Sequence, residues 1–265
     1  MTTTHRGATD PIGADLLRLL KTSNSGRWPT PCPNAPPWPA NTNSATSASW
    51  KPCSPTRSPD ASPAAAALRA TKAGLDPTMR FDTWTAHEDL RYDRTLLGDL
   101  TSLRFLDAGQ SAIVLGPVGV GKTHLATALG HMAIRRRNTV VFGRADKLFT
   151  RLRAARLDHT VDAEIRRLAA VDVLIIDDFA LRPLDATETS DFYEIVVERH
   201  RAKTTIVTSN REPAEWLTMT ADTLLAQSAI DRLTSAAHTL VIEGPSYRQR
   251  TRPQLDPDPT DKHPQ

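Results

Sequence analysis

The stretch Gly116-Pro-Val-Gly-Val-Gly-Lys-Thr123 decides the fold of this chain of 265 residues. It follows the apolar run Ala112–Leu115 and precedes residues 124–129, which suit a helix. A strand, a glycine-rich loop and a helix in this order form the setting in which the pattern G-x-x-x-x-G-K-T binds phosphate. The loop's backbone N–H groups surround the anion, and the helix turns the positive end of its dipole towards it. The alternative is a glycine turn that only caps a helix.

The roles within this loop follow from the chemistry of ATP bound with Mg²⁺. Lys122 is expected to reach the β- and γ-phosphates, and the hydroxyl of Thr123 is expected to hold Mg²⁺. The sequence therefore predicts ATP and Mg²⁺ as cofactors. The residues expected to contact the nucleotide run from the loop into the helix: Gly116, Pro117, Val118, Gly119, Val120, Gly121, Lys122, Thr123 and His124.

Two carboxylates follow a second apolar run. Residues 171–176 are rich in aliphatic side chains, as buried strands of parallel sheets are, and Asp177 and Asp178 come next. Open α/β sheets bind ligands at the carboxyl ends of their strands. We therefore expect Asp177 to act as a partner of Mg²⁺ and Asp178 to orient or polarise the attacking water. The alternative is an acidic strand end that faces solvent.

Two further polar side chains complete the predicted site. Asn210 comes shortly after the apolar run Thr204–Thr208, where it can contact the γ-phosphate or the attacking water; the alternative is an Asn that only forms a turn. Arg232 lies beside Asp231 on a short apolar helix. In oligomeric ATPases an arginine from a neighbouring subunit stabilises transition-state charge. An ion pair between Asp231 and Arg232 is the alternative, although adjacent helix positions do not face each other.

The order of these motifs resembles that of the IstB family, the helper ATPases of bacterial insertion sequences, which are relatives of the DnaC helicase loaders within the AAA+ class. The resemblance covers about residues 75–250. It implies a Mg²⁺ and water-activating pair at Asp177 and Asp178, a sensor at Asn210 and a trans-acting arginine at Arg232. Asp178 departs from the broader AAA+ pattern, in which Glu is commoner, and its shorter side chain suggests slow hydrolysis. The segments that carry the resemblance are 116–123, 174–178, 205–211 and 225–233.

The fold class implied is α/β: the AAA+ type of P-loop NTPase, with a parallel five-stranded sheet flanked by helices and no full C-terminal lid. Alternating strand-like and helix-like patterns point to the same parallel sheet. The family's strand order would place the strand before Asn210 between the phosphate-loop strand and the Asp177 strand. The strands are expected at Ala112–Leu115, Thr139–Phe142, Val173–Asp177, Thr204–Thr208 and Thr239–Ile242.

The N-terminal region has a different composition. Residues 22–67 contain no Leu, Ile, Val, Phe, Met or Tyr but hold 10 of the 20 prolines, so disorder is expected. Two explanations stay open: a genuine Pro/Ser-rich tether, or a frame-shifted remnant, over residues 22–64, of the helical domain that IstB-like proteins carry here. A helix-like pattern resumes at Ala66–Lys72. The expected organisation is an N-terminal region over 1–74, an AAA+ ATPase domain over 75–245 and a flexible tail over 246–265.

Charge and hydropathy indicate the compartment and the partners. No apolar run is long enough to span a bilayer, and the first residues lack a signal-peptide core, so we expect a cytoplasmic protein without a membrane partner. Residues 131–170 contain ten Lys or Arg and four Asp or Glu, a net charge of +6. Such a cluster can bind duplex DNA without reading its sequence. The alternatives are a solvated helix face and contacts with a neighbouring subunit.

Three functions remain open. The first is a homo-oligomeric, DNA-binding ATPase that assists a cognate transposase. The second is a DnaC-like helicase loader, which would keep the same active site; an adjacent transposase gene would separate the two. The third is a P-loop kinase for a small molecule, which Asn210 and Arg232 argue against. ATP turnover stimulated by DNA rather than by a metabolite would exclude the kinase.

Overall fold

The computed structural model describes residues 62–84 and 89–250. The predictions for residues 22–61 and for residues 251–265 lie outside the described residues. The first described helix, α2 (Pro63–Lys72), includes the segment with the helix-like pattern. The compact unit that contains the sheet begins at Ala66, nine residues before the start expected for the ATPase domain, and the domain bounds stay a prediction. The physical reason for the earlier start is packing: Ala73 and Leu75 are buried.

Five parallel strands form one sheet in the order β2-β3-β4-β1-β5. This confirms the predicted sheet and the central place of β4 between β3 and β1. The last strand starts earlier than expected, because Ala237 and His238 pair with Ser111 and Ala112 although they carry no apolar strand pattern. The strands are β1 (Ser111–Leu115), β2 (Val140–Arg144), β3 (Val173–Asp177), β4 (Thr204–Ser209) and β5 (Ala237–Val241).

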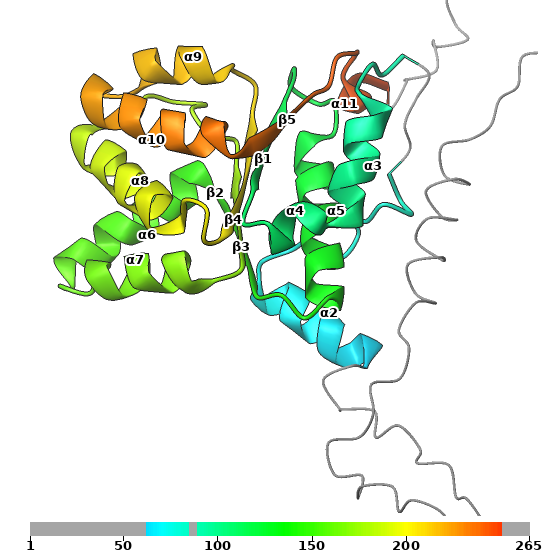
Figure 1. Cartoon of the computed structure of the whole chain (residues 1–265), viewed down its shortest axis with the longest axis horizontal. Coiled ribbons are helices and arrows are strands. Elements are labelled where there is room, and N and C mark those ends of the chain that lie inside the picture. Colours follow the sequence, from blue (N-terminus) through cyan, green and yellow to red (C-terminus); the bar gives the residue numbers. More distant parts are fainter. Residues whose placement is uncertain (1–61, 85–88, 251–265) are drawn as a thin grey trace, which may run out of the picture. The chain divides into compact units, whose positions relative to one another are not determined.

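Helices cover both faces of the sheet (Figure 1). One face carries α3 (Arg94–Ser102), α4 (Arg104–Asp107) and α5 (Lys122–Arg135). The other carries α6 (Ala145–Leu157), α7 (Val161–Ala170), α8 (Ala186–Arg199), α9 (Pro213–Trp216), the 3-10 turn η2 (Leu217–Met219) and α10 (Thr223–Ser235). The segment expected to be a flexible tail begins with a short helix, α11 (Tyr247–Arg250), because the N–H of Tyr247 donates to the carbonyl of Gly119 at 2.9 Å.

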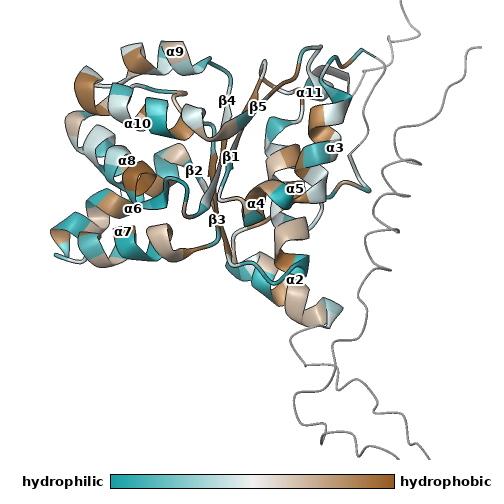
Figure 2. Ribbon diagram, in the orientation of Figure 1, coloured by the Kyte–Doolittle hydropathy of each residue, from teal (hydrophilic) through white to brown (hydrophobic). Residues whose placement is uncertain are grey.

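Apolar strands and amphipathic helices place the core on both sides of the sheet. Every residue of β1, β3 and β4 is buried, and Figure 2 shows the hydrophobic colour along β1 and β3. Alternate strand residues face opposite layers, so Ile113 and Ile176 belong to the cluster shared with α6–α10. Helix α8 begins at a capping box, in which the side chain of Asp185 accepts from the N–H of Glu188 at 2.8 Å.

A buried arginine joins the amino ends of the strands to the helices. Arg199 is 1% exposed, and its Nη1 donates to the carbonyls of Leu168 at 2.7 Å and Val171 at 2.8 Å. Its Nε donates to Oγ1 of Thr205 at 3.0 Å, and its Nη2 donates to the carbonyl of Thr204. Burial lowers the pKa of Arg199 to about 10, which leaves it charged at neutral pH. The guanidinium thus links the carboxyl end of α7 to the first residues of β4 through hydrogen bonds.

Segments that precede β1 contact both edges of the sheet near its carboxyl end. At the β2 edge, the N–H of Phe142 donates to the carbonyl of Ala73 at 2.8 Å. Beyond β5, Arg91 and Glu243 form an antiparallel bridge with two hydrogen bonds of 2.9 Å. The chain therefore occupies hydrogen-bonding positions at both edges.

Candidate functional site

The glycine-rich loop connects β1 to α5 in a conformation that only glycines allow. Gly116, Gly119 and Gly121 have φ values of +149°, +88° and +100°. A Cβ at Gly116 would lie 2.1 Å from the carbonyl oxygen of Ile242, and one at Gly119 would lie 2.0 Å from Oγ of Ser246. Both the backbone conformation and the close neighbours therefore require glycine.

Lys122 begins α5 and folds back over the loop. Its Nζ donates to the carbonyls of Gly116 and Pro117, each at 2.8 Å. Burial lowers the pKa of Lys122, while the nearby charges of Asp178 and Asp177 oppose this change. The lysine charge therefore lies between the loop and the two carboxylates that end β3.

Asp177 and Thr123 meet where the predicted Mg²⁺ site should be. The hydroxyl of Thr123 donates to Asp177, with Oγ1 2.9 Å from Oδ1 and 3.1 Å from Oδ2. Thr208 of β4 donates to Oδ1 at 2.5 Å. Burial raises the pKa of Asp177, partly offset by the Thr208 hydrogen bond. The carboxylate is thus fixed by two hydroxyls from neighbouring elements.

This pair fits the ligand chemistry of Mg²⁺. Among the described residues, no group of three or more His, Cys, Asp or Glu could hold a metal ion. Mg²⁺ does not require one, because it is usually held by one or two carboxylates together with phosphates and water. A hydroxyl at Thr123 and a carboxylate at Asp177 are such donors, beside the phosphate loop.

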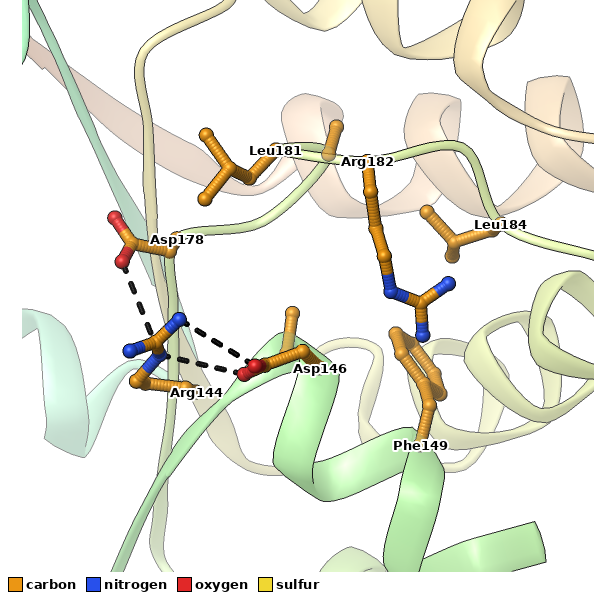
Figure 3. A pocket seen from close by; sticks show the side chains of 9 residues that line it. Arg144, Asp146, Phe149, Asp178, Leu181, Arg182 and Leu184 are labelled. Carbon is orange, nitrogen blue, oxygen red and sulfur yellow. Dashed lines mark hydrogen bonds and ion pairs between the residues drawn. The ribbon is translucent and has the colours of Figure 1, made fainter.

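Asp178 stands in a different environment from its neighbour. Its backbone is left-handed, with φ of +54°, and its N–H donates to Oγ1 of Thr208 at 3.0 Å. Its side chain is partly exposed, and Oδ2 lies 4.0 Å from Nε of Arg144. Arg144 also pairs with Asp146 at 3.3 Å, so it lies between two carboxylates (Figure 3). The pair borders a small pocket of about 110 Å³ beyond β2 and β3.

A larger cavity of about 590 Å³ opens over the phosphate loop. Its size is within the range of nucleotide and cofactor pockets. The structure brings Asp178 and the exposed Asn210 to this cavity together with residues 118–124 of the loop and helix. Gly116 and Pro117 do not line it, and neither does Asp177, which the two threonines contact.

Several residues that line the cavity belong to none of the motifs found in the sequence. They come from the segment before β1 and from the segment after β5, which are far from the loop in sequence. The turn-rich stretch 76–84, with its single tryptophan, was the only available signal. These residues are Thr78, Met79, Thr83, Trp84, Leu90, Pro245, Tyr247 and Arg248.

Arg232 lies away from this cavity. Its Nη1 donates to the carbonyl of Ser228 at 2.9 Å and bonds Oγ of the same residue. Its guanidinium lies 5.9 Å from the ring centroid of Tyr193 on α8. Within the described residues it forms no ion pair with Asp231. The structure therefore does not bring Arg232 to the phosphate loop of its own chain.

The basic segment 131–170 is not one surface. Arg135, Arg136 and Arg137 lie at the end of α5, on one face of the sheet. Helices α6 and α7, on the other face, hold five arginines. Four of these five pair with acidic side chains of the same chain. The pairs are Arg151 with Glu164, Arg153 with Asp185 and Glu188, Arg156 with Asp191, and Arg167 with Glu164. The charge count alone therefore overstates the positive surface available to DNA.

No helix in the described ranges combines the length and the apolar character needed to cross a bilayer.

Comparisons with known proteins agree with this arrangement. Residues 64–255 match the family described as IstB-like ATP binding protein. An insertion-sequence ATP-binding protein of Mycobacterium tuberculosis is 38% identical over 191 residues, which cover 72% of this chain and 76% of the relative. The ATP-binding protein of insertion sequence IS21 from Pseudomonas aeruginosa is 36% identical over 160 residues, which cover 60% of each chain.

Solved structures are similar to this chain in fold. The crystal structure of DnaI matches with a TM-score of 0.54 and 20% identity, covering 62% of this chain and 90% of the other. AMPPCP-bound DnaA from Aquifex aeolicus matches with a TM-score of 0.52 and 22% identity, covering 62% of this chain and 50% of the other. The parallel sheet with its phosphate loop is thus the AAA+ type of P-loop NTPase fold.

Proposed function

We propose, from the premise that this chain belongs to the IstB-like ATP-binding protein family, that it hydrolyses ATP with Mg²⁺ as an oligomeric, DNA-associated helper of a transposase. One observation carries the chemistry: Thr123 of the phosphate loop and Asp177 of β3 are joined by a hydrogen bond beside the loop. In P-loop NTPases a loop Ser or Thr and a strand-end Asp hold Mg²⁺, so Thr123 and Asp177 would hold it here and it would neutralise phosphate charge.

Each residue of the site has a distinct task in this proposal. The loop amides and Lys122 bind the β- and γ-phosphates, while Thr123 and Asp177 hold Mg²⁺, which supplies neutralisation of the phosphate charge when bound. Asp178, which lines the cavity, orients the attacking water, and Asn210 contacts the γ-phosphate or that water. Arg232 reaches the cavity of a neighbouring subunit, a role supported by its absence from the lining of the cavity in its own chain.

The names of the relatives favour a transposition helper over a helicase loader. They are ATP-binding proteins of insertion sequences, whereas the likeness to DnaI concerns the fold alone. The proposed partners are duplex DNA and the cognate transposase. Since many arginines of α6 and α7 already pair with acids, the end of α5 is the better candidate for a DNA contact.

Variants of the two catalytic parts test the proposal. Lys122→Ala should lower ATP binding and turnover, because the charge that meets the phosphates is lost. Arg232→Ala should keep ATP binding but lower turnover by about 10³-fold or more, as the loss of an arginine finger does. The matched control Arg201→Ala should hydrolyse ATP normally.

Mixing the two variants tests the action between subunits. A mixture of Lys122→Ala and Arg232→Ala protein should recover part of the activity, because one interface then pairs an intact loop with an intact arginine. A mixture that forms mixed oligomers and stays inactive would contradict the role of Arg232. Normal hydrolysis by Lys122→Ala would contradict the assigned site as a whole.

A further inference from the structure

One wall of the cavity comes from residues 76–84, to which no motif assigns a role. This segment folds on itself: the N–H of Met79 donates to the carbonyl of Asp76 at 3.3 Å, and that of Trp84 to the carbonyl of Phe81 at 3.3 Å. Phe81 is buried and anchors the turn. The residues that the segment gives to the cavity are Thr78, Met79, Thr83 and Trp84.

Two imidazoles of α5 hold this segment. Nε2 of His124 lies 2.8 Å from the carbonyl oxygen of Arg80, and Nε2 of His131 lies 2.8 Å from that of Asp76. A carbonyl oxygen only accepts, so each Nε2 carries the hydrogen. The two histidines are about two helical turns apart and project from the same side of α5. Helix α5, which begins at the phosphate loop, is thus bonded to residues 76–84 at two points.

The wall also reaches the phosphate loop directly. A Cβ at Gly121 would lie 3.1 Å from Nε1 of Trp84, so the indole lies against the last glycine of the loop. The ring of Trp84 is in turn fixed by an edge contact with Tyr92, with centroids 5.6 Å apart. Phosphates bound by the loop would therefore leave the rest of a nucleotide facing a surface of indole, thioether and threonine.

We propose that His124 is a positioning residue that holds residues 76–84 against α5 as the nucleoside-facing wall of the site. This rests on the proposed function. His124 follows Thr123 in the chain, so the residue that holds the wall is adjacent to the residue that holds Mg²⁺. His124 lines the cavity and was expected from sequence to contact the nucleotide, but its Nε2 is bonded to the carbonyl of Arg80, so we assign it a role through that carbonyl and not through the phosphates. Its loss should therefore weaken recognition of the nucleoside while the phosphate loop stays intact.

Calorimetric titrations with two probes separate these contributions. ATP carries a nucleoside, whereas inorganic tripolyphosphate offers only the phosphates; both are titrated in the presence of Mg²⁺. The wild-type protein should bind ATP more tightly than tripolyphosphate. His124→Ala should weaken ATP binding about tenfold, the worth of one good hydrogen bond, and leave tripolyphosphate binding unchanged. KM for ATP should rise in parallel, with little change in kcat.

Further variants control for folding and for chemistry. His124→Gln should recover most of the ATP affinity, because its amide N–H can donate to the carbonyl of Arg80. His131→Ala should show the same selective loss to a smaller extent, since Asp76 does not line the cavity, and it tests the proposal even if His124→Ala fails to fold. His200→Ala, just after α8 at the amino end of the sheet, should bind both probes as the wild type does.

The outcomes distinguish the two proposals. Equal weakening of ATP and tripolyphosphate by His124→Ala, or no weakening of either, would overturn the positioning role. So would unchanged ATP affinity in a folded His131→Ala variant together with a failure of His124→Gln to recover binding. Failure of the wild-type protein to bind either probe would instead overturn the proposed function.

Discussion

The two ends of the same sheet use charged residues in opposite ways. At the amino end, Arg199 and Asp172 are satisfied by this chain's own groups: carbonyls surround Arg199, and Lys203 and Thr139 bond Asp172. At the carboxyl end, Lys122 and Asp178 lie beside a cavity of about 590 Å³. At the amino end the charges are bonded within the chain away from that cavity, whereas at the carboxyl end they border an opening, and burial there lowers the pKa of Lys122.

This comparison makes Arg199 the most sensitive position for stability. Arg199→Met should lower the free energy of unfolding by about 3 kcal/mol or more, because several buried carbonyls lose their donor at once. Chemical denaturation measures the change. The exposed neighbour Arg201→Met should change stability little, and an Arg199→Met protein as stable as the wild type would remove the contrast between the two ends.

At the carboxyl end of the sheet, we expect replacement of Asp177 to raise the free energy of unfolding, whereas replacement of Arg199 lowers it. Burial raises the pKa of this carboxyl, so its ionised form costs stability at neutral pH, and the cost disappears as the pH falls through the raised pKa. Asp177→Asn should therefore increase the free energy of unfolding at pH 7, on the order of 1 kcal/mol, the scale of one buried polar group. Mg²⁺-dependent hydrolysis should be lost at the same time.

The increase in the free energy of unfolding caused by Asp177→Asn should also depend on pH. Denaturation of both proteins at neutral and at acidic pH should show the difference shrinking as the wild-type carboxyl becomes protonated. A variant less stable than the wild type at pH 7 would mean that the hydrogen bonds from Thr123 and Thr208 outweigh the desolvation cost.

The Asp172 carboxylate should contribute less to the free energy of unfolding, and this contribution should change only at acidic pH. Burial alone would raise its pKa, but hydrogen bonds from Lys203 and Thr139 hold it at about 2, below the ordinary 3.8. Its contribution is thus present above pH 3.8 and is lost as the pH falls towards 2. Because the pair is partly exposed, the loss should stay below about 1 kcal/mol. Asp172→Asn should lack this part of the acid dependence, which denaturation between pH 5 and 2 would reveal.

Arg144 should give the smallest change in stability. It is partly exposed beside Asp146 and Asp178, and ion pairs of this kind contribute little. Arg144→Ala should alter the free energy of unfolding by no more than about 0.5 kcal/mol. A loss as large as that expected for Arg199 would show that the carboxyl end also depends on its charges for stability.

Local sequence patterns predicted the phosphate loop and most of the strands, and the family resemblance supplied the strand order that brings the motifs together. The loop, the strand before Asp177 and the strand before Asn210 are each encoded within a few residues, and the structure brings them to one edge of the sheet. Asp178 and Asn210 line the cavity, and the roles expected for them stay predictions. Strand β5 was placed late because Ala237 and His238 lack an apolar pattern.

Contacts between distant segments could not be predicted in this way. Nothing local to residues 76–84 indicates that His124 and His131 bind their carbonyls, because the partners are separated by more than forty residues. The basic segment 131–170 is a second example of contacts that the local sequence does not reveal. Its charges suggested a DNA surface, but in the folded chain Asp185, Glu188 and Asp191 pair with Arg153 and Arg156.

The edge contacts at Ala73 and Glu243 have a consequence for assembly. An open sheet with bare outer strands invites another chain to pair with it and to extend it without limit. Here the N–H of Phe142 is already bonded to Ala73, and Arg91 and Glu243 bond each other beyond β5. A sixth strand would have to displace these segments. If the protein assembles as proposed, its copies would then meet through their helical layers, and strand exchange would be disfavoured.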